Sequence, residues 1–272
     1  MRKYFKTFVL SVLFFPIGLS ATPDYVSVAT EVGGTPNMIR SGERVPLEVA
    51  SYLEVGAKID LAVGDSCKIV MLSSGIEYSV RGPEHLTVTP AKLELASDQV
   101  LKINNLSIPA GVVFKPKEQG LEEGTLVMRF TEFGEPINLR YPVSTSVTSN
   151  TPVFSWDLVQ GAKEYRFILK NDFDETIIDT ITKLNRLALE SSAEELEYDR
   201  EYQWTVVADS KGKVYSGSSQ FNLPSREKVM RARELMQNDS SRSQLLINAL
   251  ALEEIGFRAE AEKIFTSLEI KR

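Results

Sequence analysis

The stretch "REYQWTVVA" (200–208) decides the fold of the second half of the chain. Bulky or apolar side chains alternate here with polar ones, and a β-strand places every second side chain on one face. A helix would instead scatter the rings of Tyr202 and Trp204 around its axis. An exposed pair of rings that stacks on a sugar is the alternative, but the alternation explains both rings without a ligand. The predicted inward face consists of Tyr202, Trp204, Val206 and Ala208.

Two segments upstream have the same pattern. "PVFSW" (152–156) sets Phe154 and Trp156 on one face, and "GAKEYRFILK" (161–170) alternates in the same way around Tyr165. An early-strand Trp, together with a Tyr that follows a Leu by six residues at the entry to a late strand, resembles the fibronectin type III sandwich. The resemblance implies that Tyr202 is a corner residue, whose hydroxyl bonds to nearby backbone while its ring fills the core. We predict this sandwich for residues 153–223, with Trp156, Tyr165, Leu196, Tyr202 and Trp204 as structural core residues.

The first half, residues 25–142, shows short alternating strands that are broken by Gly, Pro, Asp and Ser. Such spacing predicts an antiparallel meander that curls into a small barrel or sandwich. The order "LEVGAKIDLAVGDSCKIVMLSSGIEYSVRGPEHLTV" (53–88) resembles the extracytoplasmic FecR-type domain, which implies a relay role in cell-surface signalling. The positions that carry this resemblance are Gly56, Ile59, Ser66, Val70, Gly75, Gly82 and Pro83.

A segment rich in Ser and Thr, residues 143–152, is flanked by prolines and is predicted to link the two β domains. After residue 223 the apolar period becomes helical, with Val229, Ala232 and Met236 on one stripe. Residues 245–252 are almost uniformly apolar, so we expect that helix to be covered on two sides. The spacing of Gly256, Ala261 and Phe265 resembles one tetratricopeptide unit. We predict that residues 225–272 form a helical hairpin that caps the sandwich; a peptide-binding groove in the hairpin is the alternative.

Residues 1–21 have the order of a secretory signal: basic residues, then an apolar run, then small residues. We expect this segment to be cleaved and the protein to be periplasmic, in a Gram-negative bacterium; an uncleaved signal that anchors it to the membrane is the alternative. The net charge is −6, and no cluster of Lys and Arg of the kind that binds nucleic acid is visible.

The residues that carry most catalytic and metal chemistry are scarce. His85 and Cys67 are the single histidine and cysteine, which argues against a Ser-His-Asp triad and against a zinc site. Cys67 alternates within a predicted core strand, so we interpret it as a small buried hydrophobe. Acids in "NDFDETIID" (171–179) lack the glycine and the distal Glu of an EF-hand loop, and a solvated turn explains them. We predict no catalytic, metal or cofactor site.

Two β modules with a helical addition and no recognisable reactive group favour a non-enzymatic protein. The leading hypothesis is an envelope interaction protein, a signalling or assembly scaffold, that binds an envelope or inner-membrane protein partner. We expect recognition by a strand edge or a helix groove. The alternative is a module that binds a cell-wall glycan or another small ligand, and an enzyme that works through carboxylates alone is a third hypothesis.

Overall fold

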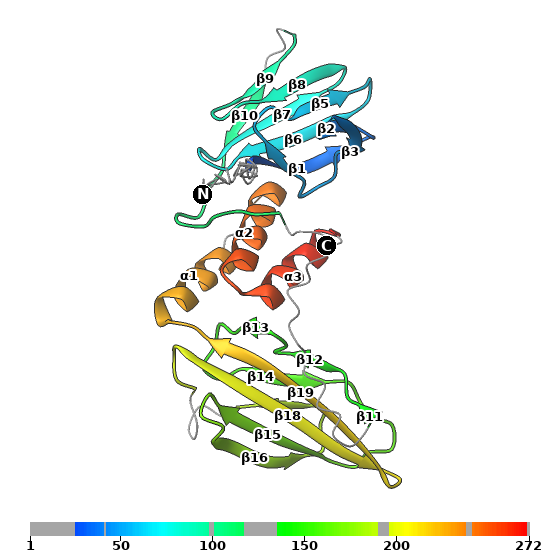
Figure 1. Ribbon diagram of the computed structural model, residues 1–272, viewed down its shortest axis with the longest axis vertical. Coiled ribbons are helices and arrows are strands. Elements are labelled where there is room, and N and C mark those ends of the chain that lie inside the picture. Colours follow the sequence, from blue (N-terminus) through cyan, green and yellow to red (C-terminus); the bar gives the residue numbers. More distant parts are fainter. Residues whose placement is uncertain are drawn as a thin grey trace, which may run out of the picture.

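The computed structural model describes residues 25–40, 42–97, 101–116, 135–189, 196–237 and 241–270. The predicted signal segment, residues 1–21, lies outside these residues. The molecule is elongated, with a β-sandwich at each end and three helices between them (Figure 1). The fold is mainly β, as the sequence predicts.

The first sandwich consists of two five-stranded antiparallel sheets, in the orders β10-β7-β6-β1-β4 and β3-β2-β5-β8-β9. Alternate apolar side chains such as Ile59 and Ile69 point between the two sheets and form their core. Each sheet ends in edge strands, so the described strands form a sandwich and no closed barrel. The strands are β1 (Tyr25–Gly33), β2 (Asn37–Arg40), β3 (Glu43–Pro46), β4 (Tyr52–Glu54), β5 (Lys58–Leu61), β6 (Ser66–Met71), β7 (Ile76–Arg81), β8 (Glu84–Val88), β9 (Leu93–Leu95) and β10 (Lys102–Asn105).

The second sandwich packs a three-stranded sheet, β12-β14-β17, on a larger sheet of order β11-β19-β18-β15-β16, in which β13 also pairs with β19. Aromatic rings fill the space between the sheets: Phe154 meets Trp204 edge-on, with ring centroids 5.2 Å apart. The strands are β11 (Glu135–Pro136), β12 (Leu139–Tyr141), β13 (Thr145–Ser146), β14 (Val153–Trp156), β15 (Tyr165–Asn171), β16 (Thr176–Thr182), β17 (Arg186–Ala188), β18 (Arg200–Ser210) and β19 (Lys213–Leu223).

The boundary between the β domains differs from the sequence prediction. Strands β11 and β12, which we assigned to the first domain, pair with β19 and β14 and so belong to the second sandwich. Within the predicted linker 143–152, β13 pairs with β19 and Val147 is fully buried. These short strands complete the second sandwich by pairing with β14 and with the distant β19, which local composition does not reveal.

The helices are α1 (Arg226–Gln237), α2 (Arg242–Glu254) and α3 (Arg258–Ser267). Helix α2 packs against α1, α3 and strand β1 of the first sandwich, and α3 contacts β13 of the second. In α2, every residue from Leu246 to Leu252 is buried. The helix is therefore covered on all sides along this stretch, whereas we expected cover on two sides. In α1, Leu235 is buried and Met236 is exposed, so the inward stripe ends one residue earlier than predicted.

The helices join the two sandwiches rather than capping one of them. A single apolar cluster runs from Val28 and Val70, on the outer face of the first sandwich, through α2 to Trp204 in the second. The chain therefore builds one sandwich, then the other, and returns to fill the space between them (Figure 1). Because α2 is enclosed by these neighbours, its side chains from Leu246 to Leu252 are not accessible to a peptide. No helix in the described ranges is long and apolar enough to cross a membrane.

Candidate interaction surface

The residues that the sequence singled out lie in the interior. Tyr202 and Trp204 are 4% and 0% exposed, so neither ring is available to stack on a sugar. The Trp204 indole donates a hydrogen bond to the carbonyl oxygen of Pro142, at 2.8 Å. Gly256 lies in the turn between α2 and α3 with φ of +94°, a conformation that glycine adopts without strain. The other predicted core residues, all buried, are Trp156, Tyr165, Leu196, Ala261 and Phe265.

Tyr202 forms the corner at the start of β18. Its hydroxyl oxygen accepts a hydrogen bond from the backbone N–H of Glu197, at 2.8 Å, and donates one to the carbonyl oxygen of the same residue, at 3.2 Å. The ring stacks on Phe221. One side chain thus fixes the loop that enters β18, in the geometry of a tyrosine corner.

Cys67 and His85 do not form a reactive pair. Cys67 is buried in the first sandwich, and this burial raises the pKa of its thiol to about 12, so the nucleophilic thiolate is scarce near neutral pH. The His85 side chain is exposed, and its Nδ1 lies 2.7 Å from a carboxylate oxygen of Asp60. Hydrogen bonds from His85 and Arg44 lower the pKa of Asp60.

The acids in the turn after β15 also do not converge. Asp172 pairs with Arg200, and Asp174 pairs with Lys170. The part of the chain that the structure describes holds no group of three or more His, Cys, Asp or Glu side chains that could bind a metal ion.

Buried carboxylates occur one at a time. Glu77, for example, accepts hydrogen bonds from Thr30 and from Asn104. Glu260 binds Lys263 and the Tyr141 hydroxyl, which ties α3 to β12. Each buried acid has its own donors rather than another carboxylate as its partner; the four buried acids are Asp65, Glu77, Glu84 and Glu260.

The feature that stands out on the surface is the free edge of the large sheet. Among the described strands, β16 pairs with β15 alone, so one side of its backbone has no strand beside it. Figure 1 shows this strand at the end of the molecule farthest from the first sandwich. Its sequence, "TIIDTIT", contains six β-branched residues in a strand of seven. The side chain of Ile181 is 61% exposed at this edge.

Few of the features that normally protect an edge strand are present in β16. Natural edges carry lysines, prolines, bulges or a covering element, because unpaired strand backbone recruits other chains. Here the one charged residue, Asp179, is bound by both ends of the Arg166 guanidinium, at 2.8 and 2.5 Å. This pairing lowers the pKa of Asp179 and neutralises the charge at the edge. A bulge interrupts the pairing only near the start of β16, opposite Lys170.

The exposed face of the sheet next to β16 carries both ion pairs and uncharged side chains: Arg166 and Lys170 of β15 are paired with Asp179 and Asp174. Thr205 and Gln203 of β18 hydrogen-bond to the Ser218 hydroxyl of β19. Ile168 of β15 lies opposite Thr205 on one side and Asp179 on the other. A strand added at β16 would therefore extend a surface of uncharged and ion-paired side chains.

No family model and no curated protein matches this chain. Among solved structures, it is similar to the twitchin kinase region from C. elegans, at 15% identity and TM-score 0.24, over 34% of this chain and 17% of that one. The titin kinase with its flanking domains gives 16% identity and TM-score 0.24, over 39% of this chain and 20% of that one. The FN1–FN3 domains of chicken CNTN1 give 10% identity and TM-score 0.21, over 70% of this chain and 56% of that one.

The chain spans a fifth or less of the first two of these structures. Their TM-scores are too low to support an argument about this chain. The likeness of the second domain to a fibronectin type III sandwich rests on its own geometry: a three-stranded sheet packed on a larger one, and the tyrosine corner at β18.

Sequence reasoning did not single out β16 as a surface. The run of β-branched residues in "TIIDTIT" indicates a strand, but it does not say whether one or two neighbours pair with it. Only the strand order places this segment at the edge.

Proposed function

We propose that this protein is a non-enzymatic envelope scaffold that binds an extended segment of a protein partner by adding it to the β16 edge. The observation that carries the proposal is the seven-residue free edge of β16, with its neutralised charge and exposed Ile181. Strand addition takes its affinity from main-chain hydrogen bonds and its specificity from alternate side chains. The partner segment that fits is β-branched and uncharged, because it lies beside threonines and isoleucines.

The packed core between the sandwiches supports the scaffold role. A partner held at β16 stays at a fixed distance from the first sandwich, because one apolar cluster connects both ends. The first sandwich is then free to contact a second envelope component, as an assembly or signalling adaptor requires.

The proposal includes a FecR-like first domain. Three positions that carry this resemblance are glycines for a physical reason. Gly56 and Gly75 have positive φ, at +84° and +72°, and a Cβ on Gly82 would lie 1.9 Å from the carbonyl oxygen of Ala62. The resemblance therefore marks positions at which the backbone of this sandwich turns tightly.

We further propose that residues 1–21 direct export to the periplasm and are removed. Mass spectrometry of the protein purified from its own cells should show an N-terminus after residue 21, in the periplasmic fraction. Recovery of the uncut chain from the cytoplasm would contradict export.

The docking edge is tested by photo-crosslinking in intact cells. A photoreactive amino acid replaces Ile181 in one variant and Val63, which is 84% exposed on the first sandwich, in a matched control. We expect the probe at residue 181 to capture an envelope protein that the probe at residue 63 does not capture. The additional change Thr180→Lys should abolish the capture, since a lysine at an edge strand opposes strand addition.

Three results would overturn the proposal. The probe at residue 181 captures nothing, captures only further copies of this chain, or captures the same proteins as the probe at residue 63. The fold of each variant is checked by its thermal unfolding. The substitutions at the exposed residues 181 and 63 should change the free energy of unfolding by no more than about 0.5 kcal/mol, and the variant with the change at the half-buried Thr180 must still unfold cooperatively for its loss of capture to count.

A further inference from the structure

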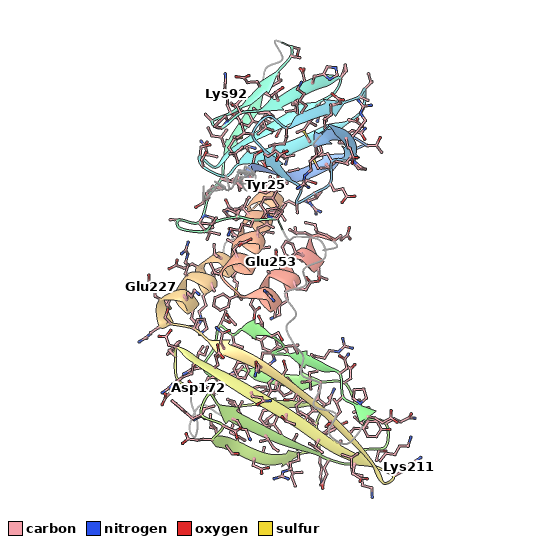
Figure 2. The ribbon with its side chains drawn as sticks, viewed as in Figure 1. Tyr25, Lys92, Asp172, Lys211, Glu227 and Glu253 are labelled. Atoms are coloured by element: carbon pink, nitrogen blue, oxygen red, sulfur yellow. The ribbon has the colours of Figure 1, made fainter. Side chains whose placement is uncertain are left out.

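A pocket lies at the far end of the second sandwich, away from the helices. Strands β18 and β19 are 11 residues each, whereas β14 in the facing sheet has 4, so their hairpin projects beyond it. Figure 2 labels Lys211 at the tip of this hairpin. Loops 136–138 and 157–161 lie against the inner side of the projection and leave a cavity of about 640 Å³. Its buried floor is formed by Ile137, Val159 and Ser210.

The loops around the pocket are held by specific contacts. The backbone N–H of Val159 donates a hydrogen bond to the hydroxyl oxygen of Tyr165, at 2.9 Å, and the Ser210 hydroxyl donates one to the carbonyl oxygen of Gln160, also at 2.9 Å. Gly161 has φ of +85°, and a Cβ there would lie 2.7 Å from the Ser210 hydroxyl oxygen. The pocket is therefore preformed, as small-ligand sites usually are.

The charges around the pocket favour an anion. The acid in its lining, Asp157, is neutralised by the Arg140 guanidinium, at 2.5 and 3.0 Å. Lys213 is mostly exposed and its charge is partly offset by Glu135, 3.5 Å away, so the unpaired positive charge at the pocket comes from Lys211. For Lys211, the described residues provide no ion-pair partner. A positive site of this kind is notable in a chain with net charge −6.

The uncharged groups of the lining suit a sugar. Tyr215 contributes a ring, Leu158 and Ile137 contribute apolar surface, and Asn138 and Gln160 contribute amides. The CH faces of a sugar pack on rings and aliphatic groups, while amides bind its hydroxyl groups. We propose that this pocket binds a sugar that carries a carboxylate group, with Lys211 and Lys213 on the carboxylate.

The test is an NMR titration of the purified full chain with N-acetylmuramic acid and with N-acetylglucosamine. The two sugars share the ring and the acetamido group, and only the first carries a carboxylate. We expect chemical shift changes at the lining residues and affinity for the acid that is about tenfold higher, the size of one charge-assisted hydrogen bond. Added salt should reduce this preference, because exposed charges are screened.

Lysine variants test whether Lys211 and Lys213 cause the preference for the carboxylated sugar. The double change Lys211→Gln and Lys213→Gln should remove the preference for the acid while leaving the weak binding of the neutral sugar. Lys163→Gln is the control, since Lys163 is an exposed residue of the adjoining loop that does not line the pocket. The proposal would be overturned if the two sugars bound with equal affinity, or if no lining residue changed its chemical shift. It would also be overturned if Lys163→Gln removed the preference for the acid as fully as the double lysine variant does.

Two further arms separate the sources of such a sugar. Cosedimentation of the protein with purified peptidoglycan, reduced in the double lysine variant, supports a cell-wall source. Binding of glucuronic acid but not of glucose, without cosedimentation, supports a free sugar acid. If none of these carboxylated sugars binds, the proposal fails, whatever the crosslinking at β16 shows.

Discussion

At the residue scale, single polar atoms fix the loops around a core of rings. The Tyr202 hydroxyl both accepts from and donates to the backbone of Glu197, so it replaces the water that this turn would otherwise bind. The resemblance to the fibronectin type III sandwich, which the spacing of Leu196 and Tyr202 helps to carry, implied a corner at this position.

We predict that Tyr202→Phe lowers the free energy of unfolding by about 1–3 kcal/mol, because the backbone groups of Glu197 lose their partner. Chemical denaturation measures the change. Tyr198→Phe is the matched control, since Tyr198 is a half-buried tyrosine a few residues away for which the described residues provide no hydrogen bond. Equal effects of the two substitutions would show that the corner contributes nothing.

Alkaline pH should destabilise the protein through buried acidic groups that keep their protons when folded. Burial raises the pKa of the Cys67 thiol from 9.0 to about 12, and burial next to Glu260 raises that of Tyr141. Between the two pKa values of Cys67, 9.0 in the unfolded chain and about 12 in the folded one, the unfolded chain releases a proton that the folded chain retains. The stability from this group is therefore complete below pH 9.0 and is lost as the pH rises toward 12. Denaturation at several pH values measures this loss; Cys67→Ala should make it smaller, and an unchanged slope would contradict the assignment.

At the element scale, the sequence predicted best where burial is decided within one segment. The alternation around Trp204 indicated β18, and the apolar run at residues 245–252 indicated α2. The sequence did not place β11, β12 and β13 in the second sandwich. These strands have two or three residues each; β11 and β13 are held by β19, far along the chain, and β12 by β14. The candidate docking edge was hidden for the same reason, because the pairing of β15, and not the sequence of β16, leaves that edge open.

At the scale of the whole molecule, α2 joins two domains that the sequence suggested were only linked. The Gln244 amide donates to the carbonyl oxygen of Ser107 and accepts from its N–H, both at 2.8 Å, and so binds the segment that leaves the first sandwich. Periodicity shows that a helix is apolar all round, but not which surfaces cover it. That information lies in contacts between residues more than a hundred positions apart.

The packing of α2 against its neighbours indicates that the three helices join the sandwiches into one rigid body. Spin labels on Lys92→Cys, in the first sandwich, and Lys183→Cys, in the second, test it by pulsed electron paramagnetic resonance; Cys67 should resist labelling because it is buried. We expect a single narrow distance distribution between the two labels, and we expect Gln244→Ala to broaden it. A broad distribution with Gln244 in place would mean that the sandwiches move independently and that the helices do not hold them together.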